Sequence, residues 1–145
     1  MKKEEIINKL KTYCTKEQSI SFALIFGSYC NDNILYPKDL DIGLYTKGDI
    51  SLLKLGKIIT DLQELSGMKI DTVILNGIYK REPKFAYEII LRHILLCTKR
   101  KSEYIVFKRD TFLYYFDMKS MLGIADQSFM KRLKSYNFGK YNYVR

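Results

Sequence analysis

Two segments decide the fold: ISFALIFGS at residues 20–28 and, after a spacer of ten residues, DLDIGLY at residues 39–45. The first is an apolar run that ends at Gly27-Ser28, which predicts a strand buried on both faces. The second alternates polar and apolar residues, so it predicts a strand with Asp39 and Asp41 on one face and the apolar side chains on the other. A third segment, KIDTVIL at residues 69–75, predicts another strand that carries a further acid, Asp71.

Helical periodicity surrounds these strands. Amphipathic spacing predicts an opening helix over about residues 3–17. A second helix is predicted from about Asp49 to Leu65, with Asp49 or Ser51 as its cap and Gly67 as its stop. A third helix is predicted from Pro83 to about Arg92, because proline fits the first turn. A fourth is predicted over about residues 103–133, with a break near Gly123. Residues 94–97 fit either a helix end or a short strand, and the tail over residues 135–145 has no clear period.

Length and composition favour one globular domain over residues 1–145, with a core at about 18–97 and a helical, basic region at about 98–145. The 145 residues are 47% hydrophobic and 14% aromatic, which is enough to bury a core and argues against wholesale disorder. The N-terminus lacks the apolar region of a secretory signal, and no run approaches the roughly 20 apolar residues of a membrane span, so we expect a soluble, cytoplasmic protein. Three widely spaced cysteines indicate neither a disulfide framework nor a zinc site.

The formal net charge of +9 is concentrated in the C-terminal third of the chain. Residues 1–97 hold 14 basic and 12 acidic side chains, whereas residues 98–145 hold 11 basic and 4 acidic ones. Such a region suits nucleic acid, an acidic protein surface or simply water, because net charge bears on association before it bears on chemistry.

The acids and the Gly-Ser turn suggest phosphoryl chemistry. Alternate residues of a strand point the same way, so Asp39 and Asp41 can offer converging carboxylates to Mg²⁺, and Asp71 on another strand can help to hold a second ion. Gly27 lets the backbone approach an anion, and Ser28 adds a hydroxyl donor for terminal phosphates. The alternative is a plain turn beside three carboxylates that are solvated or paired with lysine.

This arrangement resembles the nucleotidyltransferase superfamily related to DNA polymerase beta, in particular its minimal MNT-type members, which occur as antitoxins beside HEPN-domain toxins. The resemblance rests on Gly27-Ser28, the ten-residue spacer, Asp39-Leu40-Asp41, the later Asp71, and the stretch EPKFAYEIILRHILL at residues 82–96. It covers about residues 18–118. The fold it implies is α+β: a small mixed β-sheet with helices packed against it, the acids on adjacent strands, and a helical C-terminal region.

The resemblance also implies roles for individual residues. Gly27 and Ser28 would bind the triphosphate of ATP, Asp39 and Asp41 would ligate Mg²⁺, and Asp71 would be the third acid, a metal ligand that also activates the acceptor hydroxyl; two Mg²⁺ ions are expected. The chain departs from many relatives, which follow Gly-Ser with Arg and a further Gly. Here Tyr29-Cys30-Asn31-Asp32-Asn33 follows, and the next basic residue is Lys38.

Three functions stay open at this point. The first is transfer of AMP from ATP to a protein hydroxyl, such as a tyrosine of a HEPN-domain toxin, since no separate acceptor-binding domain is evident. The second is a binding module that neutralises a partner by occlusion through Phe112, Tyr115, Phe116 and residues 118–122, although core packing is the commoner use of such side chains. The third is nucleic-acid binding through residues 98–145, where basic residues are mixed with Tyr and Phe that could stack on bases. For the single histidine, His93, we expect a structural role.

Overall fold

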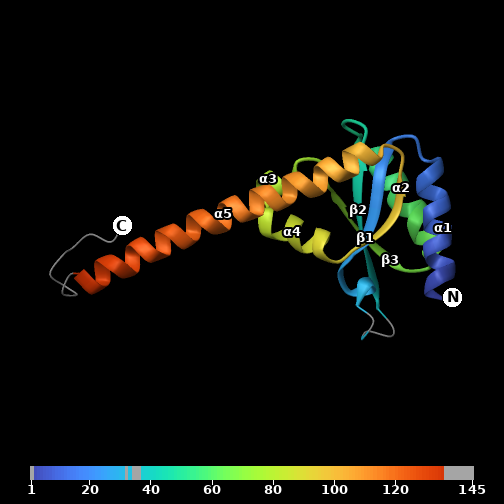
Figure 1. Ribbon diagram of the computed structural model, residues 1–145. Coiled ribbons are helices and arrows are strands. Elements are labelled where there is room, and N and C mark those ends of the chain that lie inside the picture. The colour runs from blue at the N-terminus through green and yellow to red at the C-terminus, as the bar shows by residue number, and fades with distance from the viewer. Residues whose placement is uncertain (1, 32, 34–36, 136–145) are drawn as a thin grey trace.

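The computed structural model describes residues 2–31, 33 and 37–135, and for residues 122–135 only the backbone. Four strands form one sheet in the order β3-β2-β1-β4 (Figure 1). Their bounds are Ile20–Phe26 for β1, Asp39–Thr46 for β2, Lys69–Ile74 for β3 and Ile94–Thr98 for β4. Strand β1 pairs antiparallel with both β2 and β4, whereas β2 pairs parallel with β3. The sheet is therefore mixed, and the predicted α+β fold is confirmed.

Helices cover both faces of the sheet. The helices α1 (Lys3–Lys16) and α2 (Leu52–Ser66) pack on one face, where Leu10, Leu40 and Leu62 belong to one buried cluster. The helices α4 (Pro83–Leu91) and α5 (Lys101–Ser135) pack on the other face, where Phe22 and Phe107 share a second cluster. All seven residues of β1 are buried because this strand lies in the middle of the sheet and contributes to both clusters.

The capping predictions hold at three positions. The Ser51 side chain accepts a hydrogen bond of 3.1 Å from the Lys54 backbone N–H at the start of α2, and Gly67 ends that helix with a left-handed φ of 67°. Pro83 occupies the first turn of α4. Residues 94–97, ambiguous in the sequence, lie in β4 because they pair with β1.

One expectation about the helices needs correction, and one short helix was not predicted. The predicted break near Gly123 is wrong: α5 continues through it to Ser135, because one glycine costs a helix interior only about 1 kcal/mol. A one-turn helix, α3 (Ile78–Arg81), precedes α4 and is not indicated by any periodicity in so short a segment. The short 3₁₀ turn η1 (Gly27–Cys30) follows β1 directly, as the Gly-Ser signal predicts.

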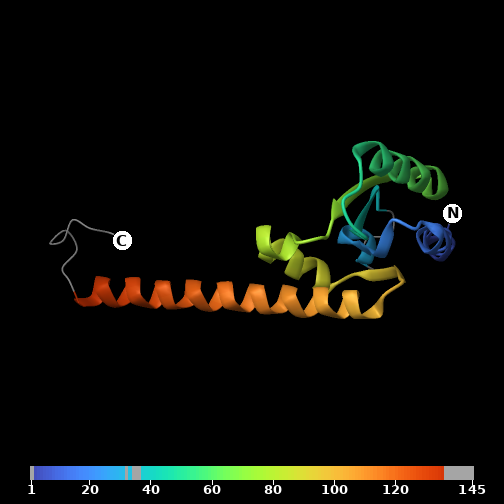
Figure 2. The same ribbon diagram turned by 90° about the horizontal axis from the view of Figure 1, so that it is seen from above.

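The helix α5 packs on the domain with its first half only. Phe107 and Thr111 are buried, and Tyr115 stacks on Tyr87 of α4 with ring centroids 3.9 Å apart. Beyond this contact the helix projects away from the rest of the protein (Figures 1 and 2). No helix in the described part of the chain is long and apolar enough to cross a membrane.

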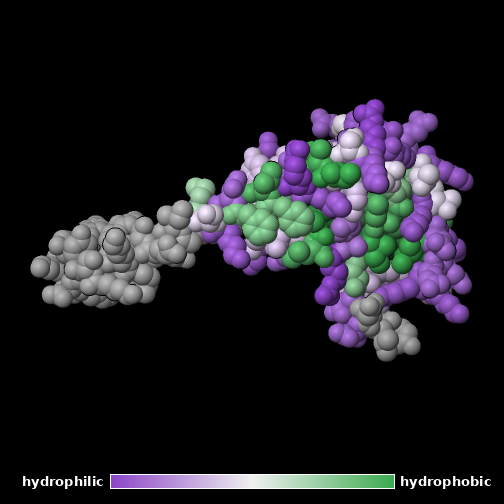
Figure 3. All heavy atoms as spheres, viewed as in Figure 1, coloured by the Kyte–Doolittle hydropathy of each residue, from purple (hydrophilic) through white to green (hydrophobic). Residues whose placement is uncertain are grey.

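The side chains proposed as an occluding surface divide between core and solvent. Tyr115 and Phe112 pack against the domain, whereas Leu113, Phe116 and Met121 are 55%, 50% and 71% exposed. Figure 3 shows apolar side chains at the surface along the part of α5 that lies over the domain. The side chain of Leu122 and the tail at residues 136–145 lie outside the described residues.

Candidate active site

The three acids lie on neighbouring strands at one end of the sheet. Asp39 and Asp41 alternate along β2, and Asp71 of β3 is the direct register partner of Asp41. Residues opposite each other in register share a face, so the three carboxylates project from the same side of the sheet. Leu40 and Ile42 point to the opposite face, where they are fully buried. The alternation predicted from the sequence therefore gathers the acids.

Gly27 brings the turn η1 against this acidic face. Phe26 is the register partner of Asp41 across β1 and β2, so the next residue, Gly27, begins the turn beside that acid. Its φ is 77°, which favours glycine, and a Cβ at this position would overlap Asp41 Oδ2. Ser28 follows directly and is exposed. The structure thus brings the predicted Gly-Ser turn and the predicted acids together.

Contacts from elsewhere in the fold hold this turn in place. Tyr29 is buried in the cluster beneath α1, and Lys3 of α1 donates a hydrogen bond of 2.9 Å to the Tyr29 carbonyl. The Cys30 thiol donates to the Ile25 carbonyl at 3.3 Å. The backbone of Gly27 and Ser28 is therefore fixed between β1 and the anchored half of the turn, while its other side stays open.

Electrostatic repulsion acts within the acidic face. Burial raises the pKa of Asp41 above its ordinary value, and the negative charges of Asp71 and Asp39 raise it further. None of the ion pairs among the described residues involves these three acids. Lysine pairing, the alternative left open by the sequence, is thus not what the described structure shows.

The donor chemistry of this face fits a hard divalent cation. Carboxylate oxygens are the ligands that Mg²⁺ takes in proteins, and a cation would relieve the repulsion that Asp41 experiences. In the side-chain conformations of this structure, no three histidine, cysteine or acidic residues within the described ranges lie close enough together to hold an ion. Asp39, Asp41 and Asp71 therefore form an open set that could ligate an ion only together with waters or substrate oxygens.

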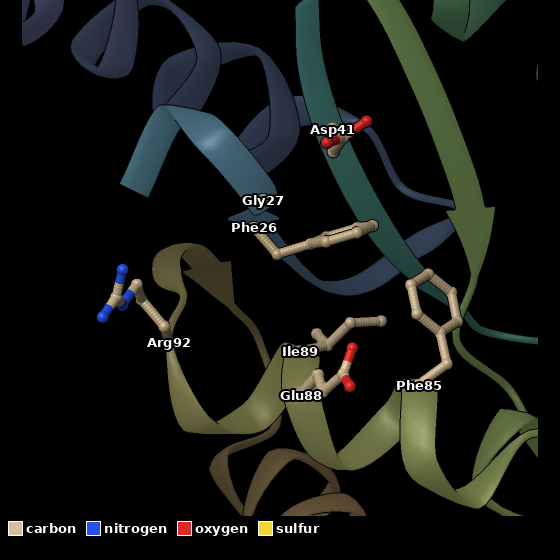
Figure 4. Close-up of a pocket in the computed structure, with 7 residues that line it drawn as sticks. All are labelled: Phe26, Gly27, Asp41, Phe85, Glu88, Ile89 and Arg92. Atoms are coloured by element: carbon tan, nitrogen blue, oxygen red, sulfur yellow. The ribbon is translucent and has the colours of Figure 1, made fainter. Parts of the chain in front are cut away.

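A cavity of about 340 Å³ opens beside the acids. Figure 4 shows the Phe26 ring between Asp41 and the side chains of α4. Phe26 and Phe85 meet edge to face with ring centroids 5.8 Å apart, and they form an apolar wall. The residues that line the cavity are Phe26, Gly27, Asp41, Phe85, Glu88, Ile89 and Arg92. An apolar wall beside carboxylates and a glycine turn can accept a molecule that is part flat ring and part anion.

Sequence reasoning missed the part of this cavity that α4 supplies. Phe85, Glu88 and Ile89 follow one another at helical spacing on one face of α4, and Arg92 is the residue that caps the C-terminal end of this helix. That spacing was visible in the sequence. What was not visible is that α4 lies across the end of β1, because this contact depends on the return of the chain through β4.

Comparisons with known proteins agree with this geometry. Residues 8–102 match the family model described as Polymerase beta, Nucleotidyltransferase. A protein of Methanocaldococcus jannaschii named "Putative protein adenylyltransferase" is 32% identical over 91 residues, which are 63% of this chain and 93% of that relative.

Solved structures show the same fold at low sequence identity. One is described as a toxin–antitoxin with AMP-PNP; the match has a TM-score of 0.63 at 16% identity and covers 88% of this chain and 98% of that one. Another is described as a tri-AMPylated HEPN toxin of Shewanella oneidensis in complex with an MNT antitoxin; it has a TM-score of 0.61 at 15% identity and covers 86% of this chain and 98% of that one. Together with the family match, which spans more than half of the sequence, these findings show that the chain belongs to the polymerase beta nucleotidyltransferase family.

Proposed function

We propose that this chain transfers AMP from ATP to a hydroxyl of a partner protein and releases pyrophosphate. The partner that we infer is a HEPN-domain toxin, with a tyrosine as the acceptor, so the chain would act in the cytoplasm as a type VII antitoxin. The Methanocaldococcus relative named for protein adenylylation and the Shewanella complex with an AMPylated toxin support this choice of reaction and partner.

One observation carries the proposal: three carboxylates on one face meet a glycine turn at the mouth of a cavity. The carboxylates of Asp39, Asp41 and Asp71 project from neighbouring strands in register. Gly27 touches the carboxylate of Asp41, and both line the cavity. Metal-binding acids, a phosphate-binding turn and room for a base are the parts that nucleotidyl transfer requires.

Each residue then has a separate task. Asp39 and Asp41 would hold Mg²⁺, with Asp71 as a further ligand for a second ion, and bound Mg²⁺ would neutralise charge on the phosphates during in-line displacement. The open backbone of Gly27 and the Ser28 hydroxyl would hold the phosphate tail. Asp71 would accept the proton of the acceptor hydroxyl as its oxygen bonds to the α-phosphorus. The bond from that phosphorus to the bridging oxygen breaks, and pyrophosphate leaves.

The test is a transfer assay with the full chain, Mg²⁺, ATP labelled in its α-phosphate and a HEPN-domain protein as the candidate partner. Label should appear on the HEPN protein and should vanish with Asp41→Asn. Asp49→Asn is the matched control, since Asp49 is exposed and lies outside the cavity. Absence of labelling by the wild-type chain would refute the proposal.

Occlusion is the second candidate, and the projecting part of α5 is the observation that favours it. Leu113, Phe116 and Met121 expose apolar surface on a helix whose distal half projects away from the domain (Figures 1 and 2). A partner held there would be blocked without chemistry. An Asp41→Asn chain that still neutralised the toxin fully would favour occlusion over transfer.

The basic C-terminal region gives weaker support to nucleic-acid binding. Lys99 donates a hydrogen bond to the Glu17 carbonyl, and Arg109 forms an ion pair of 2.9 Å with Asp110. These two cations therefore already have partners within the chain. Affinity for RNA or DNA that fell steeply with salt would revive this function.

A further inference from the structure

We propose that Arg92 binds the phosphate tail of the nucleotide and supplies the positive charge that the Gly27–Cys30 turn lacks. This inference rests on the proposed function, because it assigns a residue to the nucleotide that the acids and the turn would bind. Nothing in the spacing of the Gly-Ser motif points to Arg92, which follows 64 residues after Ser28.

The charge of the site creates the need for such a residue. Asp39, Asp41 and Asp71 share one face, and Glu88 adds a fourth carboxylate on the cavity wall. From Gly27 onward the chain has no lysine or arginine until Lys38. A triphosphate is itself a polyanion, so bound Mg²⁺ would offset part of its repulsion by the acids, and a cationic side chain at the cavity would offset more of it.

Arg92 is placed to meet this need. It ends α4 and lines the same cavity as Gly27 and Asp41. In Figure 4 its guanidinium lies at the edge of this cavity and extends away from the carboxylates of Glu88 and Asp41. None of the ion pairs in the described ranges involves Arg92, so its five N–H donors remain available for phosphate oxygens.

The neighbouring histidine fixes the backbone from which Arg92 extends. His93 Nδ1 lies 3.0 Å from the Ile90 carbonyl, and His93 Nε2 lies 2.6 Å from the Tyr104 hydroxyl of α5. With Nδ1 donating to the carbonyl, Nε2 accepts from the hydroxyl. This clamp ties the end of α4 to α5, so Arg92 is held at the cavity mouth while its side chain stays exposed.

Lys69 is the competing cation. It is the register partner of Asp39, so it lies on the acidic face beside the metal-binding acids. It does not belong to the cavity that Gly27 and Arg92 share. Its position suits partial neutralisation of Asp39, whereas Arg92 lines the cavity that Gly27 of the turn also lines.

The test compares equilibrium binding of ATP, ADP and AMP to the full chain in the presence of Mg²⁺. Variants Arg92→Gln and Arg92→Lys are measured beside the wild type, with Lys84→Gln as the matched control because Lys84 is an exposed cation of the same helix outside this cavity. Loss of a charged hydrogen-bonding partner predicts that Arg92→Gln weakens ATP binding about ten- to hundredfold. AMP binding should change far less, Arg92→Lys should fall between, and Lys84→Gln should match the wild type.

Several outcomes would overturn the assignment. Unchanged ATP binding by Arg92→Gln, or equal losses for ATP and AMP, would refute the role of Arg92 in holding the tail. A large loss of ATP binding in Lys69→Gln, with none in Arg92→Gln, would assign the tail to the β3 side instead. In all these cases the wild type still binds ATP and the proposed function stands, whereas a wild type that binds no nucleotide would refute both. Thermal unfolding of each variant checks that a loss of binding is not a loss of fold.

Discussion

Replacing Gly27 with alanine should damage the site more than the fold, and the structure lets the two effects be separated. Gly27 has a φ of 77°, and a Cβ there would overlap Asp41 Oδ2. The left-handed backbone costs alanine about 1–2 kcal/mol. The overlap adds about 0.5–1.5 kcal/mol if the Asp41 carboxylate turns away from its preferred rotamer. We therefore expect Gly27→Ala to lower the free energy of unfolding by about 1.5–3.5 kcal/mol.

Gly67→Ala is the matched control for the backbone cost. Gly67 has a similar φ of 67°, and nothing lies within 4 Å of the position that a Cβ would take. Its loss should be about 1–2 kcal/mol, with labelling activity unchanged. Gly27→Ala, in contrast, should lower the transfer rate about a hundredfold, because a displaced carboxylate no longer holds the metal in place.

A double-mutant cycle decides whether the overlap is real. Asp41→Ala removes the carboxylate, and the remaining Cβ of residue 41 would lie 3.5 Å from a Cβ at position 27, an ordinary contact. In the Asp41→Ala background, Gly27→Ala should cost no more than Gly67→Ala, measured by urea unfolding. Equal costs of Gly27→Ala in both backgrounds would show that turn and acid do not touch, and would refute the reasoning.

Three further substitutions test other contacts. Asp41→Asn should raise the free energy of unfolding at neutral pH, because the raised pKa of Asp41 means that its ionisation opposes folding. The gain should vanish below the ordinary pKa of 3.8, and a gain that persisted there would contradict this cause. Gly43→Ala should lower the free energy of unfolding by about 1–3 kcal/mol, because the new Cβ would lie 2.9 Å from the Leu75 side chain. An unchanged free energy in chemical unfolding would mean that the side chains around Gly43 are loosely packed. Tyr104→Phe removes the 2.6 Å hydrogen bond to His93 and should lower the free energy of unfolding, measured by thermal unfolding, by about 0.5–1.5 kcal/mol. No loss would argue against the proposed tie between α4 and α5 through His93 and Tyr104.

The strands that carry the acids can be predicted from the sequence because their alternation of polar and apolar residues matches the faces that are exposed and buried in the fold. In β2 the alternation of Asp39, Leu40, Asp41 and Ile42 matches one wet face and one buried face. The Gly-Ser turn is predicted from a local signal, the glycine that follows a buried strand, although the close approach of Gly27 to Asp41 is a tertiary contact. The resemblance to known nucleotidyltransferases adds the expectation that Asp71 lies beside Asp41, which the register confirms.

The features that could not be predicted depend on contacts between distant segments. Residues 94–97 form a strand only because they pair with the otherwise unpaired edge of β1. The wall of the cavity requires α4 to pack across Phe26, and no local pattern reveals which helix does so. The predicted break at Gly123 was wrong for a different reason: a single glycine destabilises a helix by only about 1 kcal/mol, which is too little to end a helix of this length.

The projecting part of α5 is a helical arm whose length and rotation are both set by its number of residues. From Met118 to Ser135 a helix extends about 25 Å at 1.5 Å per residue, and each residue also turns it by about 100°. A molecule bound at the far end would therefore have an orientation, relative to the domain, that is set by the residue count of the arm. Inserting two residues there would swing that molecule to the opposite side of the axis, whereas seven residues would restore its orientation and merely lengthen the reach.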